Sequence, residues 1–176
     1  MESMFGTIKG KRVLVTGASS GIGASIAKLF ASYGAFVGLH YRKSKLQAMG
    51  VLRECKKAGG KMEIFQGDLL KSTVRKRLIK SFVDVFGGID ILINNAGGIY
   101  NYKHFSEIDE NSWDNTFNLN TKAPFFLSVD AFEYMKKQRW GRIINITTTG
   151  VKYVGAKSMH YTASKAALDT LTLGFA

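Results

Sequence analysis

The alternation of short apolar runs with longer amphipathic stretches constrains the fold of this chain more than any other feature. Runs typical of strands occupy residues 12–16, 35–40, 62–66, 89–93 and 142–146. Stretches with helical spacing of apolar residues lie at 22–33, 44–58, 69–86, 112–138 and from 158 onward. This order predicts an α/β fold: a doubly wound, Rossmann-like parallel sheet with helices on both faces.

Composition points to one soluble domain. The chain has 176 residues, 45% of them hydrophobic, which is enough apolar mass for a core. No apolar run approaches the ~18 residues of a membrane span, and residues 1–11 lack the apolar stretch of a secretory signal. The single cysteine, Cys55, cannot form an internal disulfide and fits a reducing compartment. We therefore predict one domain over residues 1–176, cytoplasmic and without a membrane partner.

The formal net charge of +12 makes nucleic-acid binding an alternative to weigh. The basic residues are scattered along the chain, however, and neither zinc-ligand spacing nor an aromatic-plus-basic nucleic-acid motif occurs. We therefore expect a solvated basic surface, no metal site and no nucleic-acid partner. Some of the positive charges would serve an anionic cofactor or substrate.

A glycine-rich segment follows the first apolar run and opens the first helical stretch. It reads Thr16-Gly17-Ala18-Ser19-Ser20-Gly21-Ile22-Gly23. Glycines allow a tight turn and a close approach to a pyrophosphate, while a helix N-terminus offers N–H groups and the positive end of the helix dipole. The G-x-x-x-G-x-G spacing differs from the G-x-G-x-x-G dinucleotide fingerprint. Its strand–turn–helix setting nevertheless predicts nucleotide binding rather than a simple turn.

The end of the second apolar run bears on which dinucleotide would bind. An acidic residue usually stands here to bind the ribose 2′-hydroxyl of NAD. This chain has Tyr41, Arg42 and Lys43 instead. A guanidinium suits a 2′-phosphate through charge-assisted hydrogen bonds, so the segment favours NADP(H) over NAD(H). An exposed loop charge is the alternative.

Polar and small residues follow the third and fourth apolar runs. Asp68, before Leu69, could accept a hydrogen bond from an adenine amino group or could cap the next helix. Asn95, Ala96 and Gly97 suit either a ligand crevice at the carboxyl end of a parallel sheet or an ordinary turn.

Two further polar positions have a structural and a functional interpretation. Asn120 lies in a helical stretch that is otherwise apolar around it, and the residues alone favour a structural hydrogen bond. Thr148 belongs to the threonine triplet that ends the fifth run. Its hydroxyl could bind a substrate carbonyl, or it could be there for strand propensity alone.

Tyr161 and Lys165 stand four residues apart in the last helical stretch, so both side chains project from one helix face. Two unit charges about 4–5 Å apart at an effective dielectric of about 20 interact by roughly 3–4 kcal/mol. An ammonium at that distance would lower the pKa of the tyrosine from about 10 to about 7–8. The pair therefore predicts general acid–base chemistry.

In this order, the motifs resemble the short-chain dehydrogenase/reductase family from Arg12 to the last helix, and in detail its NADPH-linked 3-oxoacyl-acyl-carrier-protein reductases. The resemblance implies that Tyr161 is the catalytic acid/base and that Lys165 lowers its pKa and holds the nicotinamide ribose. It implies that Asn120 binds a water linking Lys165 to solvent. Thr148 stands thirteen positions before Tyr161, where the family has serine.

The resemblance also implies a set of cofactor-binding residues along the chain. These are Gly17, Ser19, Ile22 and Gly23 at the phosphates, Tyr41 and Arg42 at the 2′-phosphate, Asp68 and Leu69 at adenine, and Asn95, Ala96, Gly97, Tyr161 and Lys165 toward the ribose and nicotinamide. Relative to the family, the chain would lack the last two strands and the segment that closes over the substrate.

The function implied is an NADP(H)-dependent oxidoreductase that interconverts a small-molecule carbonyl and a secondary alcohol. Alternatives are a carrier-protein-bound substrate, a sugar or polyol dehydrogenase of the same family, and a cofactor-binding but non-catalytic fragment or interaction module. A homodimer or homotetramer is implied as well. Apolar residues of the stretch 112–138 fit either such an interface or the core of a monomer: Phe117, Phe125, Phe126, Leu127 and Phe132.

Overall fold

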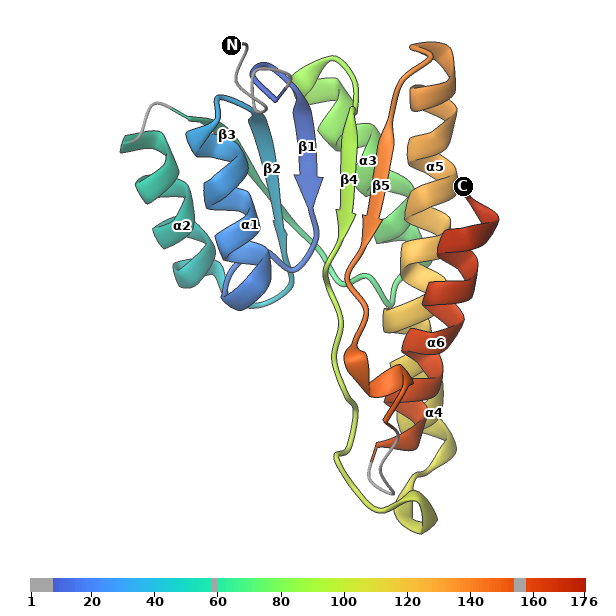
Figure 1. Cartoon of the computed structure of the whole chain (residues 1–176). Helices are drawn as coiled ribbons and strands as arrows, with labels where there is room; N and C mark the ends of the chain where they lie inside the picture. The colour runs from blue at the N-terminus through green and yellow to red at the C-terminus, as the bar shows by residue number, and fades with distance from the viewer. Residues whose placement is uncertain (1–7, 58–59, 154–157) are drawn as a thin grey trace.

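The computed structural model describes residues 8–57, 60–153 and 158–176 (Figure 1). Five parallel strands form one sheet in the order β3-β2-β1-β4-β5. They are β1 (Arg12–Val15), β2 (Phe36–Tyr41), β3 (Lys61–Gln66), β4 (Ile91–Asn94) and β5 (Arg142–Asn145). The doubly wound α/β fold is therefore confirmed, and each strand begins and ends within two residues of its predicted limits.

Helices cover both faces of the sheet (Figure 1). They are α1 (Gly21–Ser32), α2 (Lys45–Lys57), α3 (Ser72–Phe86), α4 (Glu110–Phe117), α5 (Ala123–Lys137) and α6 (Met159–Gly174), with short 3-10 turns η1 (Phe105–Glu107) and η3 (Thr149–Val151). The predicted end of the second helix at residue 58 lies outside the described residues. Within the described ranges, no helix combines the length and the apolar character needed to cross a membrane.

Strand side chains alternate between two hydrophobic cores, as the two-residue period of a strand requires. Val13 and Val15 of β1 are buried in the core that contains the apolar faces of α1 and α2. Leu14, between them, is buried in the opposite core with Phe82 of α3 and Leu127 of α5. Burial on both faces explains why three successive residues are apolar in β1 (Val13–Val15) and in β4 (Ile91–Ile93).

The stretch predicted as helical over residues 112–138 is helical from Glu110 to Lys137, but a change of hydrogen-bond register divides it into α4 and α5. Between them lies the π-helical segment η2 (Asn118–Lys122), in which the Ala123 N–H donates to the Asn118 carbonyl five residues back. Pro124 then stands in the first turn of α5, where a residue without an N–H is tolerated. The π-helical interruption therefore comes before the proline.

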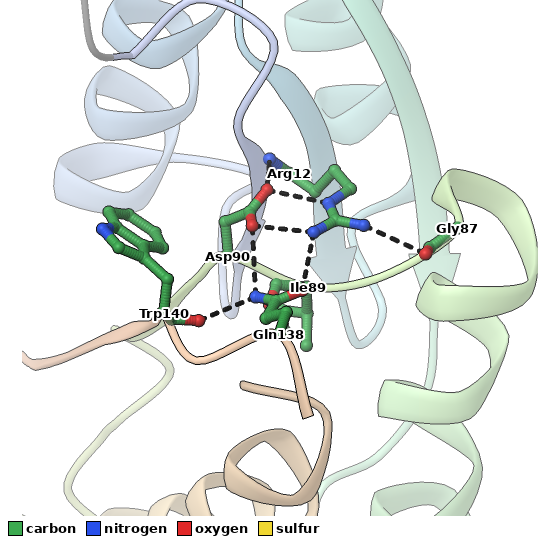
Figure 2. A network of polar contacts seen from close by, with 6 residues as sticks. All are labelled: Arg12, Gly87, Ile89, Asp90, Gln138 and Trp140. Atoms are coloured by element: carbon green, nitrogen blue, oxygen red, sulfur yellow. Dashed lines mark hydrogen bonds and ion pairs between the residues drawn. The ribbon is translucent and has the colours of Figure 1, made fainter. Parts of the chain in front are cut away.

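A polar network joins the amino ends of β1 and β4 (Figure 2). The Arg12 guanidinium donates two hydrogen bonds to Asp90, from Nε to Oδ2 and from Nη2 to Oδ1, both at 2.7 Å. The Arg12 backbone N–H adds a third at 2.8 Å to Oδ2. Burial acts to raise the pKa of Asp90, but the bonds and charge of Arg12, with the charge of Lys11, outweigh it and hold that pKa below its usual value.

Gln138, which follows α5, extends the network toward β5 (Figure 2). Its Oε1 accepts from Arg12 Nη2 at 2.7 Å, and its Nε2 donates to the backbone carbonyls of Ile89 and Trp140 at 2.7 and 2.8 Å. One arginine, one aspartate and one glutamine thereby tie together three neighbouring strands at the edge opposite their carboxyl ends.

Candidate active site

A cleft of about 390 Å³ opens at the carboxyl ends of the strands. The strand order reverses between β1 and β4, and doubly wound sheets bind ligands at this kind of switch point. Turns that follow four different strands contribute to the lining. The lining residues are Gly17, Ser19, His40, Arg42, Lys43, Ser44, Gly67, Leu69, Asn95, Ala96, Gly97 and Leu119.

Two glycines of the turn at this cleft, Gly17 and Gly23, leave no room for a side chain. Gly17 has φ +64°, and a Cβ there would lie 2.9 Å from the Ala96 Cα. A Cβ on Gly23 would collide with Asn95 Nδ2 and lie 2.6 Å from the Gly17 carbonyl oxygen. Gly23 therefore acts by letting α1 approach the turn closely, rather than by lining the cleft itself.

Thr16 holds the turns after β1 and β4 together, a role that we did not predict. Its Oγ1 accepts hydrogen bonds at 3.0 Å from the backbone N–H groups of both Asn95 and Ala96. The Asn95 side chain returns the contact, since its Nδ2 donates to the Thr16 and Gly17 carbonyls at 2.8 and 3.1 Å. A hydroxyl residue directly between an apolar strand and a glycine turn is the sequence signal that could have identified it.

Several predicted cofactor residues do not line the cleft with their side chains. Ile22 is 63% exposed at the start of α1. Tyr41 is 2% exposed and packs in the α1–α2 core, because alternation along β2 turns it inward. Asp68 does not cap a helix, since α3 begins at Ser72. Its Oδ1 instead accepts from the Leu70 N–H at 3.1 Å and closes a local turn.

Arg42 lies at the mouth of the cleft with an exposed side chain. Its Nη1 donates a 2.9 Å hydrogen bond to the hydroxyl of Tyr100, which follows β4. The bond joins residues 58 positions apart, from segments that follow two different strands. A cationic group therefore stands where the sequence predicted a 2′-phosphate contact.

Gly97, which lines the cleft, also lies against η2 and α6. A Cβ on Gly97 would lie 2.9 Å from Asn120 Oδ1 and 3.1 Å from Lys165 Nζ. Lys165 is 3% exposed, and its Nζ donates a 2.6 Å hydrogen bond to the Ile146 carbonyl, just after β5. The predicted residues Gly97, Asn120 and Lys165, which come from three elements, are thus brought into one place.

The Asn120 side chain is fully engaged in structural hydrogen bonds. Its Oδ1 accepts from the Gly98 N–H, and its Nδ2 donates to the Gly98 carbonyl, both at 2.9 Å. Nδ2 also donates to Ser164 Oγ at 3.0 Å, on the helix turn between Tyr161 and Lys165. These bonds match the structural interpretation that the residues alone favour, and through them Asn120 fixes α6 against the turn after β4.

Thr148 follows β5 and begins the turn η3, rather than ending the strand. Its Oγ1 accepts from the Gly150 N–H at 3.2 Å. A Cβ on Gly150 would lie 3.4 Å from Thr148 Oγ1 and 3.9 Å from Thr162 Cγ2. The turn that carries Thr148 therefore packs against the start of α6, beside the half-buried Tyr161.

The predicted lowering of the Tyr161 pKa is wrong in this structure. Burial raises the pKa of Tyr161 above its usual value. Burial also lowers the pKa of Lys165 to about 8, although Asp169 acts against it. The reason is that helical spacing fixes the face on which the two groups lie, but not their solvation. The Lys165 ammonium donates its hydrogen bond to the Ile146 carbonyl in a buried environment.

We expect the buried Lys165 to make stability depend on pH. Between pH 8 and 10.5 the unfolded lysine holds a proton that the folded one does not, so stability rises with pH in that window. Relative to Lys165→Met, the parent should gain about 2 kcal/mol in unfolding free energy between about pH 7.5 and 9.5, measured by urea denaturation. Lys45→Met, at an exposed lysine on α2, is the control and should show no such gain. A constant difference between parent and Lys165→Met would contradict this account.

A larger groove, of about 530 Å³, lies elsewhere, beside strand β5 and the ends of α5 and α6. Phe132, Trp140, Arg142 and Phe175 line it, and none of the predicted site residues does. Size alone would select this groove as the site. The convergence of motif residues selects the smaller cleft instead.

The parallel sheet with a glycine turn at its switch point defines a Rossmann-like protein. The short chain dehydrogenase family model matches residues 11–176. Since the match covers nearly the whole sequence, the chain belongs to the short chain dehydrogenase family.

Individual relatives agree with this assignment. An uncharacterized oxidoreductase from Thermotoga maritima is 39% identical over 168 residues, which cover 96% of this chain and 65% of that protein. The crystal structure of a metagenomic short-chain oxidoreductase in complex with NADP matches with a TM-score of 0.91 at 34% identity, covering 97% and 76% of the two chains. The crystal structure of the NADH-dependent reductase A1-R′ complexed with NAD matches with a TM-score of 0.91 at 32% identity, covering 98% of this chain and 74% of that chain. The chain thus spans about 65% of the length of the Thermotoga relative.

Proposed function

We propose that this chain is an NADP(H)-dependent oxidoreductase that interconverts a small-molecule carbonyl and a secondary alcohol. The observation that carries the proposal is the position of Gly97. It lines the cleft that begins at the glycine turn, and its neighbours on the other side are Asn120 and Lys165. A dinucleotide laid along the cleft from the turn would therefore end beside α6, which carries Tyr161.

The residues of the cleft fit such a cofactor. Gly17 itself presents no side chain to the cleft, and Arg42 and Lys43 supply positive charge at the mouth. The family's bound nicotinamide supplies or accepts a hydride. The chain itself would bind and orient: Lys165 would hold the nicotinamide ribose, while Tyr161 and Thr148 would place their hydroxyls at the substrate oxygen.

The state of Tyr161 is compatible with the reductive direction. Burial raises its pKa, so the phenol is protonated at neutral pH, as an ordinary tyrosine is, and it can donate that proton to a carbonyl oxygen. Lys165, with a pKa of about 8, is mostly charged at neutral pH, and negatively charged groups bound beside it would favour the charged form further. The proton relay from Lys165 to solvent, through a water bound at Asn120, belongs to this proposal too. Pro124 has no N–H, so the Asn120 carbonyl lacks its ordinary helical donor four residues on.

Turnover measurements test the proposal. The chain would be incubated with NADPH and a panel of ketones, sugars and 3-oxoacyl thioesters, and the reduced-nicotinamide absorbance followed. Consumption of NADPH with at least one carbonyl is the expected result. Binding without turnover would favour the non-catalytic alternative, and absence of both would refute the proposal.

We expect Arg42 to set the preference between the two dinucleotides. Arg42→Ala should weaken NADPH binding by about tenfold to a hundredfold, because a charge-assisted hydrogen bond contributes about 1.5–3 kcal/mol, and should leave NADH binding unchanged. Calorimetric titration with each cofactor measures this. Tyr100→Phe is the matched control, since it removes the present partner of Arg42 and keeps the guanidinium. Equal loss for both cofactors in Arg42→Ala would contradict the assignment.

A carrier-bound substrate, a cytoplasmic location and assembly into a homodimer or homotetramer are further parts of the proposal. Exposed apolar side chains on α5 support assembly. Phe126, Val129 and Phe132 are 43%, 38% and 47% exposed at spacings that share one helix face.

A further inference from the structure

His40 lies beneath the glycine turn, at the penultimate position of β2, and is 2% exposed. Its Nδ1 accepts a hydrogen bond from the Gly17 N–H at 3.3 Å. Its backbone carbonyl accepts from the next amide of the turn, the Ala18 N–H, at 2.8 Å. One residue therefore holds two consecutive N–H groups of the turn.

The other ring nitrogen of His40 faces β3. Nε2 lies 3.1 Å from the carbonyl oxygen of Gly67, the residue that follows β3. A carbonyl can only accept and an amide N–H can only donate, so a proton on Nε2 and a lone pair on Nδ1 form the one tautomer that satisfies both contacts. His40 thereby ties the ends of β1, β2 and β3 together in a single, neutral form.

A charged ring would not fit this position. An imidazolium donates from both nitrogens and would direct an N–H at the Gly17 N–H. Burial lowers the pKa of His40 to about 4, against the smaller opposing effects of the Gly67 carbonyl and of Asp68. Arg42 and Lys43 line the same cleft and add positive charge on that side. The ring is therefore neutral throughout the neutral pH range.

We propose that His40 is a positioning residue for the cofactor, whose Nε2–H tautomer fixes the orientation of the glycine turn that receives the dinucleotide phosphates. The inference rests on the proposed cofactor function and deepens it. His40 acts on the turn, which both dinucleotides would share, whereas Arg42 acts on the 2′-phosphate. His40 therefore serves NADP(H) and NAD(H) alike.

Three variants remove the ring contacts selectively. His40→Asn can place an amide oxygen near the Nδ1 position and keep the Gly17 bond. His40→Gln can place an amide nitrogen near the Nε2 position and keep the Gly67 bond. His40→Phe fills much of the same volume and keeps neither. Each would be titrated with NADPH and with NADH by reduced-nicotinamide fluorescence, after thermal unfolding has shown that it is folded.

We expect His40→Phe to weaken both dinucleotides by about tenfold and by the same factor, and His40→Asn to restore most of the affinity. Arg42→Ala, by contrast, should weaken NADPH alone. If His40→Phe does not fold, the proposal is tested by comparing His40→Asn with His40→Gln. The His40→Asn variant must then bind both dinucleotides more tightly than the His40→Gln variant. Unchanged affinity in His40→Phe, or equal affinity in the Asn and Gln variants, would overturn the proposal.

Nitrogen NMR of the histidine ring tests the proposed tautomer directly, while the difference in affinity between folded His40→Asn and His40→Gln separates a positioning role from a merely structural one. At pH 6 the parent should show a neutral Nε2–H ring that is absent in His40→Asn. A charged ring or the Nδ1–H tautomer would overturn the proposal. If the parent bound neither dinucleotide, the proposed function would fall together with the role of His40. If the parent binds and His40→Phe binds equally well, only the role of His40 falls.

Discussion

Replacing Tyr161 with phenylalanine is expected to lower the rate of carbonyl reduction by about 10²–10⁴-fold, the usual contribution of a positioned general acid. The substitution removes one hydroxyl and keeps the ring, so α6 and its contacts through Ser164 and Lys165 should be unaffected. NADPH binding should therefore stay close to that of the parent. The measurement is NADPH oxidation with a carbonyl substrate that the parent reduces, beside a binding titration.

Tyr134→Phe is the matched control for this change. Tyr134 is a half-buried tyrosine on α5 that contacts Lys137 and does not line the cleft. Its loss of a hydroxyl should leave turnover unchanged. Equal turnover in Tyr161→Phe and the parent would remove Tyr161 from the mechanism. A parallel loss of NADPH binding would instead assign it to cofactor positioning.

Asp90→Asn is expected to destabilise the fold by about 3 kcal/mol, because it leaves a partly buried guanidinium without its charge partner. The Asp90 and Arg12 side chains are 9% and 22% exposed, and Gln138 depends on both. Since the folded pKa of Asp90 lies below its ordinary 3.8, its contribution is fully present above that pH and is lost as the pH falls through the folded value. Urea denaturation at pH 7 and near pH 3 measures both effects.

Asp84→Asn provides the same substitution in an exposed ion pair. Asp84 pairs with Lys80 one helical turn away on α3, with side-chain exposures of 59% and 68%. Exposed pairs contribute little, so this variant should lose far less stability than Asp90→Asn. Comparable losses in the two aspartate variants, or a negligible loss in Asp90→Asn, would show that the network in Figure 2 does not hold the strands together.

The doubly wound parallel sheet was open to prediction because local signals agree with one another. Apolar runs flanked by glycine and helical periodicity each indicate βαβ units, and right-handed crossovers leave few arrangements for such units. The division of the long helix into α4 and α5 was not predicted from composition. A π-helical segment such as η2 arises from hydrogen-bond register, which side-chain spacing between residues 112 and 138 does not encode.

In the candidate site, the backbone motifs were easier to predict than the electrostatics. Gly17 and Gly97 line the cleft as expected, since glycine conformation and strand ends are local properties. The pKa directions of Tyr161 and Lys165 depend on burial by distant elements, which no spacing rule supplies. His40 was missed for the same reason: in the sequence it is a polar residue at a strand end, and its partners Gly17 and Gly67 are set by the sheet.

The central claim is that one cleft, from the glycine turn to the buried Lys165, receives the dinucleotide. Mapping NMR shifts of the backbone amides and lysine side chains during an NADPH titration tests it most directly. We predict saturable shifts at Gly17, Ala96 and Gly97 and at the Lys165 ammonium. The shifts of residues in the larger groove beside β5, which we call the Trp140 groove, should stay unchanged. Shifts that gather at the Trp140 groove, or an absence of shifts at saturating NADPH, would contradict it.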